Sequence, residues 1–162
     1  QSETITVEKE NIDLKKVVET ILPYYNELLT KKKIKVEYQF AEPVNVYADP
    51  VMIRTVFRNL LSNAVKFTYT GRKITIGEVQ ENGLFRGIFV EDQGIGISDE
   101  QLQAIKDFTD FSSTPGTLKE EGTGIGLNIV QEFLHKNDGQ IIFEKNKDEG
   151  TTVRVLLPKS KE

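Results

Sequence analysis

The sequence has 162 residues, 38% hydrophobic and 28% charged, which suits one soluble globular domain with a substantial core. Its formal net charge of −4 argues against a general nucleic-acid surface, which is normally basic. There is no cysteine and His135 is the only histidine, which excludes disulfides, thiolate metal sites and most zinc and Ser-His-Asp chemistries.

No apolar run approaches the roughly 20 residues of a membrane span, and the first residues do not resemble a signal peptide. Because the sequence opens without a methionine, we expect a domain of a longer protein. The first part of the chain predicts short strands of period two and one amphipathic helix, capped by Asn11-Ile12-Asp13. The expected elements are a strand at 4–8, a helix at 14–30, a strand at 35–40, a turn at Glu42-Pro43 and a strand at 44–48. Lys31-Lys32-Lys33 is interpreted as a solvated helix end, with phosphate binding as the alternative.

Residues 49–68 predict a long helix around which the rest of the chain is organised. Asp49 is a good N-cap, and Pro50 suits the first helical position. The apolar residues recur at helical spacing: Ile53, Val56, Phe57, Leu60, Leu61 and Ala64. A second stripe, Asn59, Asn63 and Lys66, shares one neighbouring face. Carboxamide oxygens suit Mg²⁺ and an ammonium suits phosphate, while a polar helix edge without a ligand is the alternative.

The second part of the chain predicts two paired strands, two helices and two closing strands. Asn82-Gly83 between the strands at 73–80 and 84–91 indicates a hairpin. Ser98 and Gln101 form a capping box for a short helix at 99–107, and the stretch at 108–121 is an expected mobile loop. An apolar helix then ends near Asn137-Asp138-Gly139, followed by strands at 140–145 and 151–157. This order predicts an α+β fold, a mixed and mostly antiparallel sheet with helices packed on one face.

Two glycine clusters flank the expected loop. Gly122, Gly124 and Gly126 open a helix, where free N–H groups and the positive dipole end can seat an anion. The cluster fits neither a P-loop nor a dinucleotide fingerprint, and a flexible start of the helix is the alternative. Asp92 ends a strand just before the second cluster, Gly94 and Gly96. Its carboxylate could accept from the exocyclic amine of adenine, or it could simply cap local N–H groups.

Together these residues resemble the ATP-binding catalytic domain of sensor histidine kinases, in the superfamily shared with gyrase, the MutL mismatch-repair proteins and the ninety-kilodalton heat-shock chaperone. The resemblance covers nearly the whole chain. Residues 59–68 (NLLSNAVKFT) resemble the N box and residues 92–96 (DQGIG) the G1 box. Phe108 and Phe111 fall at the F box, and residues 113–117 (STPGT) and 121–127 (EGTGIGL) resemble the lid and the G2 box.

The resemblance implies a Bergerat-type two-layer α/β sandwich over residues 1–162, with the dimerisation and phosphoacceptor domain upstream of residue 1. It implies ATP and Mg²⁺ as cofactors, with Asp92 reading adenine, Asn63 holding Mg²⁺, and Asn59 and Lys66 as catalytic residues at the phosphates. The implied nucleotide contacts are Asn59, Asn63, Lys66, Phe67, Asp92, Gly94, Gly96, Ile97, Thr117, Gly122, Thr123, Gly124, Ile125, Gly126 and Leu127. The lid would comprise residues 98–121.

Two departures from the family pattern stand out. Asn137-Asp138-Gly139 replaces the usual His-Gly-Gly, which we interpret as a structural turn whose change leaves function intact. The lid lacks the arginine that follows the F box in many members, and Lys119 is the candidate substitute.

The resemblance further implies transfer of the γ-phosphoryl group of ATP to a histidine on the dimerisation domain, with a response-regulator receiver domain downstream. It implies no nucleic-acid partner, no direct membrane contact by this domain and a cytoplasmic location. His135 lies too far along its helix from the expected phosphates to be the acceptor. One alternative is an ATP-gated conformational ATPase of the gyrase, MutL or chaperone type, which usually has a water-activating Glu where this chain has Asn59. The other is a nucleotide-binding pseudokinase, which the intact motifs disfavour.

Overall fold

The computed structural model describes residues 6–79, 83–106, 124–147 and 149–161 of the chain. The helices are α1 (Leu14–Ile21), a 3-10 turn (Leu22–Tyr25), α2 (Asn26–Lys31), α3 (Pro50–Phe67), α4 (Asp99–Lys106) and α5 (Gly124–Lys136). The strands are β1 (Glu10–Asp13), β2 (Lys35–Gln39), β3 (Asn45–Ala48), β4 (Lys73–Val79), β5 (Phe85–Asp92), β6 (Gln140–Lys145) and β7 (Thr151–Pro158).

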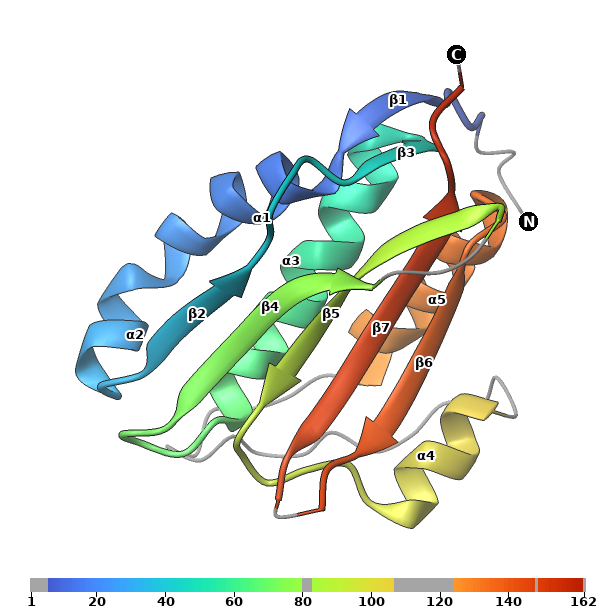
Figure 1. Cartoon of the computed structure of the whole chain (residues 1–162). Coiled ribbons are helices and arrows are strands. Elements are labelled where there is room, and N and C mark those ends of the chain that lie inside the picture. Colours follow the sequence, from blue (N-terminus) through green and yellow to red (C-terminus); the bar gives the residue numbers. More distant parts are fainter. Residues whose placement is uncertain (1–5, 80–82, 107–123, 148, 162) are drawn as a thin grey trace.

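Five strands form one sheet in the order β2-β4-β5-β7-β6 (Figure 1). Only β2 and β4 pair in parallel, while the other neighbours are antiparallel, so the predicted mixed and mostly antiparallel sheet is confirmed. β1 and β3 form a separate two-stranded ribbon, which was not predicted. The register of β4 and β5 places Ile74 opposite Asp92, and this fixes where β5 delivers its last residue.

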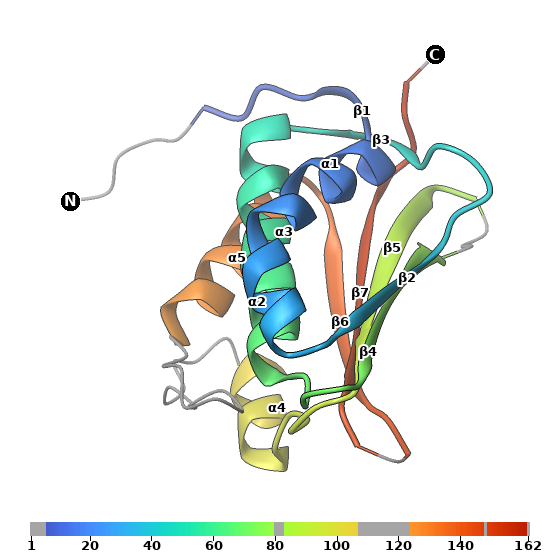
Figure 2. The same ribbon diagram turned by 90° about the vertical axis from the view of Figure 1, so that its left-hand side faces the viewer.

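The helices α1, α3 and α5 cover one face of the sheet, as the two-layer prediction requires (Figure 2). Apolar side chains from α3 and from the facing strands meet between the layers and are buried; they include Ile53, Phe57, Leu61, Ile74, Ile76, Ile88, Val155 and Leu157. Burying this much apolar surface is the main term that holds the helices on the sheet. None of the described helices is both long enough and apolar enough to cross a membrane.

The prediction for residues 49–68 is confirmed, because α3 begins at Pro50 and ends at Phe67. The two hairpin strands, the short helix after Ser98, the helix ending at Lys136 and the two closing strands are also confirmed within one or two residues. Most of the hairpin turn and the whole stretch at 108–121 lie outside the described residues.

The predictions for the first strand and the first helix are wrong. Residues 6–9 have no regular structure, and the strand is β1, whose register with β3 pairs Asn11 with Tyr47. The expected helix at 14–30 is divided by a 3-10 turn that carries Pro23 at its start. A proline inside a helix removes one N–H and crowds the preceding turn, so this break was visible in the sequence.

The interpretation of Lys31-Lys32-Lys33 as a solvated helix end is wrong for Lys32. Lys31 and Lys33 are exposed, whereas Lys32 is 0% exposed. Its Nζ donates to the carbonyls of Val65 and Lys66, both at 2.8 Å. A lysine is almost never fully buried unless its ammonium is paired, and here the partners belong to the end of α3.

Candidate functional site

The start of α3 is fixed by the residue that was predicted to cap it. The carboxylate of Asp49 accepts from the backbone N–H groups of Val51 at 2.9 Å and Met52 at 3.2 Å. Pro50 occupies the first helical position, where no N–H is needed. The cap therefore fixes where the helix begins, and the apolar face packed in the core sets the direction in which the polar stripe faces.

The polar stripe lies where its spacing predicted. Asn59, Asn63 and Lys66 are each partly buried, beside the fully buried residues that face the sheet. The Nδ2 group of Asn59 donates to the carbonyl of Thr55 at 2.9 Å, which orients this carboxamide along the helix. The stripe thus offers amide oxygens and an ammonium along the last two turns of α3.

The end of α3 is joined to the segment that follows β5. The N–H of Ile95 donates to the carbonyl of Phe67 at 3.1 Å, and Thr68 forms an antiparallel bridge with Gly94. A Cβ atom at position 94 would lie 1.8 Å from the carbonyl oxygen of Phe67, so only glycine permits this approach. Three predicted site residues, Phe67, Asp92 and Gly94, are therefore brought together.

Asp92 is a buried carboxylate at the end of β5. Its Oδ1 accepts from the N–H of Gly94 and the N–H of Thr151, each at 3.2 Å. Burial raises the pKa of Asp92 to about 6; the two N–H groups act in the opposite direction, and the neighbouring charge of Glu91 raises it further. A buried acid with a raised pKa beside glycine-bearing loops marks a candidate functional site.

Glycines also bring the loop between β6 and β7 against Asp92. Gly150 has a φ of +101°, and a Cβ atom there would lie 2.2 Å from the carbonyl oxygen of Asp92. Gly96, with a φ of +80°, faces Gly150. The side chain of Asn146 donates to the same Asp92 carbonyl at 3.2 Å. The role of Gly150 and Asn146 was not predicted.

Helix α5 begins with the predicted glycines Gly124 and Gly126 in its first turn. It runs opposite to α3, so its N-terminal end lies toward the end of the fold where α3 stops (Figure 2). Leu127 is partly buried against the core. Ile97, which lies in the chain between Gly96 and the start of α4, is also partly buried. Gly122, Thr123, Thr117 and the side chain of Ile125 lie outside the described residues, as do Lys119, Phe108 and Phe111.

A family model for histidine kinase-, DNA gyrase B- and HSP90-like ATPases matches residues 48–161. The chain belongs to this family. The match spans α3, the end of β5 and α5, which are the elements that carry the predicted motifs.

Two relatives of stated function are sensor kinases. The chain is 30% identical over 155 residues to the adaptive-response sensory kinase SasA of Crocosphaera subtropica, covering 95% of this chain and 40% of that protein. It is 30% identical over 161 residues to the sensor histidine kinase RcsC of Escherichia coli, covering 98% of this chain and 17% of that protein. The chain thus spans 40% or less of the length of these relatives.

Solved structures share the fold. The catalytic domain of histidine kinase ThkA superimposes with a TM-score of 0.80 at 24% identity, covering 95% of this chain and 99% of that one. The α+β prediction and the resemblance to sensor-kinase catalytic domains are both confirmed.

Histidine kinase-like ATPases bind ATP, and the described residues fit the base end of that ligand. Asp92 offers a buried acceptor, and the backbone around Gly94 is closed to any side chain. Within the described part of the chain, no three acidic or histidine side chains form a cluster that could hold a metal ion. Amide oxygens such as that of Asn63 are ligands that could hold a magnesium ion together with the phosphates of a nucleotide.

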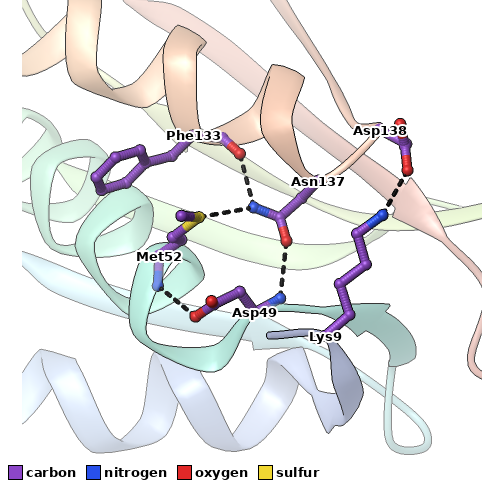
Figure 3. Close-up of polar contacts among 6 residues, drawn as sticks. All are labelled: Lys9, Asp49, Met52, Phe133, Asn137 and Asp138. Atoms are coloured by element: carbon purple, nitrogen blue, oxygen red, sulfur yellow. Dashed lines mark hydrogen bonds and ion pairs between the residues drawn. The ribbon is translucent and has the colours of Figure 1, made fainter. Parts of the chain in front are cut away.

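Asn137-Asp138-Gly139 is a structural turn, as interpreted, and its first residue also makes contacts with a distant part of the chain. Asn137 is fully buried, and its Oδ1 accepts from the N–H of Asp49 at 2.7 Å (Figure 3). Its Nδ2 donates to the carbonyl of Phe133 at 2.7 Å and approaches Sδ of Met52 at 3.3 Å. One side chain thus ties the end of α5 to the start of α3, the two helices that carry the N-box and G2-box residues.

Beside this contact, Lys9 pairs with Asp138 at 2.6 Å (Figure 3). The N–H of Glu8 donates to the carboxylate of Asp49 at 2.9 Å. The segment that precedes β1 is therefore attached to the same point. No local pattern in the sequence indicates these contacts, because the partners lie far apart in the chain.

Proposed function

We propose that this chain binds Mg²⁺–ATP and donates its γ-phosphoryl group to a histidine on a separate dimerisation domain of a two-component kinase. The observation that carries the proposal is the buried Asp92 carboxylate, held at the end of β5 and joined through Gly94 to the end of α3. Membership of the ATPase family and the sensor-kinase relatives support it.

The base would be recognised by Asp92. Both described N–H donors reach Oδ1, so Oδ2 is the oxygen that would accept from the exocyclic amine of adenine. Guanine carries a carbonyl at the matching position and would meet this oxygen with repulsion. Phe67, Gly94, Gly96, Ile97 and Leu127 would surround the base and the ribose.

The phosphates would lie between the last turns of α3 and the first turn of α5. Asn63 would ligate Mg²⁺, which neutralises phosphate charge, while Asn59 and Lys66 would orient and neutralise the transferred group. The N–H groups at Gly124 and Gly126 would seat phosphate oxygens at the positive end of α5. Gly122, Thr123, Ile125 and Thr117 would complete the enclosure.

The chemistry would consist mainly of positioning and charge neutralisation, because the acceptor imidazole is itself the nucleophile. The partners would be the chain's own phosphoacceptor domain and then a receiver domain, in the cytoplasm where ATP is available. The rival, an ATP-gated hydrolase, needs a base to activate water. Asn59 at that position carries no titratable proton, and its Nδ2 donates to Thr55 within the helix.

The test is Asp92→Asn with Asp138→Asn as the matched control, since Asp138 is an exposed acid that pairs with Lys9 and lies outside the proposed nucleotide site. The amide introduced by Asp92→Asn would present a donor to adenine's amine, so affinity for ATP should fall about ten- to a hundredfold, the cost of a lost charge-assisted hydrogen bond. The affinity for GTP should rise relative to the affinity for ATP. Titration calorimetry measures both, and equal binding of ATP and GTP by the unaltered chain would contradict the proposed role.

Affinity for adenosine should also depend on pH. The ionised carboxylate accepts the amine hydrogen bond, and because the pKa of Asp92 lies at about 6, acceptance is lost as pH falls through that value. Between pH 7 and pH 5 the ionised fraction falls about tenfold, so affinity should fall by a similar factor. The Asp92→Asn chain should show a flatter profile, and an identical slope in both would exclude Asp92 from the binding site.

A further inference from the structure

The last turn of α3 has an unusual set of caps. The last four carbonyls of a helix have no partner within it, and a glycine in the left-handed conformation commonly helps to satisfy them. Here the C-cap is Thr68, with an extended φ of −69° and ψ of 135°, so that solution is absent. The four carbonyls must find other donors.

All four do so within the described structure. The Ala64 carbonyl accepts from the N–H and the hydroxyl of Thr68, at 3.0 and 2.6 Å. The Phe67 carbonyl accepts from Ile95. The two between them, on Val65 and Lys66, both accept from Nζ of Lys32, which reaches them from the end of α2. Two of the four carbonyls are therefore satisfied by one buried ammonium that comes from outside the helix.

The position of this ammonium matters for charge. The C-terminal end of a helix carries the equivalent of about half a negative charge. Asn63 lies two residues before Val65, about 3 Å along the axis, so the proposed phosphate-binding stripe ends at that negative pole. A polyphosphate would be repelled there unless a cation offsets the pole. Lys66 is one such cation, on the stripe itself. Lys32 is a second one, and its 0% exposure shields it from water and salt.

We propose that Lys32 is a positioning residue of the nucleotide site: its buried ammonium holds the last turn of α3, which carries Asn63 and Lys66, and offsets the negative end of that helix where the phosphates bind. The inference rests on the proposed ATP site. A second contact fixes the same corner, because the N–H of Gly71 donates to the carbonyl of Lys32 at 2.8 Å. Lys32 therefore contributes to the affinity for phosphates without touching the nucleotide.

The experiment compares the affinities for Mg²⁺–ATP and adenosine in the unaltered chain, Lys32→Met, Lys32→Gln and Lys32→Arg. Loss of the cation should lower the affinity for Mg²⁺–ATP about tenfold, which is in the upper range of helix-dipole effects. The affinity for adenosine should change by less than about twofold. Lys32→Gln keeps one donor without the charge and should lose the ATP preference like Lys32→Met. Lys32→Arg keeps the charge and should retain most of the preference for ATP over adenosine.

Leu14→Ala is the control, because Leu14 is a fully buried side chain at the start of α1, far along the fold from the end of α3. It should lower the unfolding temperature and leave the ratio of the two affinities unchanged. If Lys32→Met does not fold, the Gln and Arg variants decide. If the unaltered chain binds ATP and the Lys32→Gln variant has the same ratio of ATP affinity to adenosine affinity, the inference is overturned. Failure of the unaltered chain to bind either ligand would instead overturn the proposed function on which the inference rests.

Discussion

Replacing Asn137 by alanine should destabilise the fold, because one side chain serves two helices. The change removes the acceptor for the N–H of Asp49 and the donor to the carbonyl of Phe133, both at 2.7 Å. The Asp49 bond is buried, so water cannot easily replace it, whereas the Phe133 carbonyl is only partly buried. The two losses should therefore be unequal.

A buried group left without a partner costs about 1–3 kcal/mol, and a partly hydrated one costs about 0.5–1.5 kcal/mol. The sum is about 1.5–4.5 kcal/mol, a large part of the 5–15 kcal/mol that typically separates the folded and unfolded states. For a chain of this size each kcal/mol lowers the unfolding temperature by about 2–4 °C, so we expect a fall of about 3–18 °C.

Guanidinium titration and thermal unfolding measure both quantities, and Asp138→Asn is the matched control. Asparagine tolerates the positive φ of 59° at that position, and the substitution removes only the ion pair with Lys9. The Asp138 side chain is 70% exposed, so the control should change stability by less than about 1 kcal/mol. Equal, small losses in both variants would show that water replaces Asn137 without cost, and the described contacts would not stabilise the helix junction.

Three further predictions concern the helix ends and the site. Asn63→Ala should weaken Mg²⁺–ATP binding by at least tenfold in calorimetry while leaving the fold intact, whereas Ser62→Ala on the same helix should not; unchanged affinity would reassign the metal ligand. Lys33 has a φ of 55°, so Lys33→Gly should stabilise the chain by about 0.5–1 kcal/mol in denaturant titration, while Lys31→Gly should not stabilise it. Incubation with labelled ATP should leave His135 unlabelled, because nine residues of α5 place it about 13 Å from Gly126; acid-labile label there would contradict the proposed geometry.

Much of the fold followed from local patterns. Asp49-Pro50 and the apolar spacing after them located α3 to within one residue at each end, because capping and periodicity are properties of neighbouring side chains. The alternation in β4 and β5 located both strands for the same reason. Pro23 was an equally local signal, and its neglect produced one helix where the chain forms two helices and a 3-10 turn.

The errors and omissions involve partners distant in sequence. Lys31, Lys32 and Lys33 are chemically alike, and only the carbonyls of Val65 and Lys66, distant in sequence, distinguish Lys32 as the one that turns inward. Asn137 bonds a residue 88 positions earlier. Composition around either residue does not indicate a buried hydrogen bond, since polar side chains at helix ends are usually solvated. The family motifs predicted which residues gather at the site, but not what holds their helices in place.

The absence of a left-handed glycine cap at the end of α3 has a structural reason. A glycine cap in the left-handed conformation would turn the chain back across the helix end. The extended conformation of Thr68 instead continues the chain alongside Gly94, and this pairing holds Phe67 beside the segment of Asp92. The geometry that assembles the site is thus incompatible with the usual local cap. The carbonyls that the usual cap would have satisfied need a donor from elsewhere in the fold, and the long side chain of Lys32 meets that requirement from the neighbouring helix.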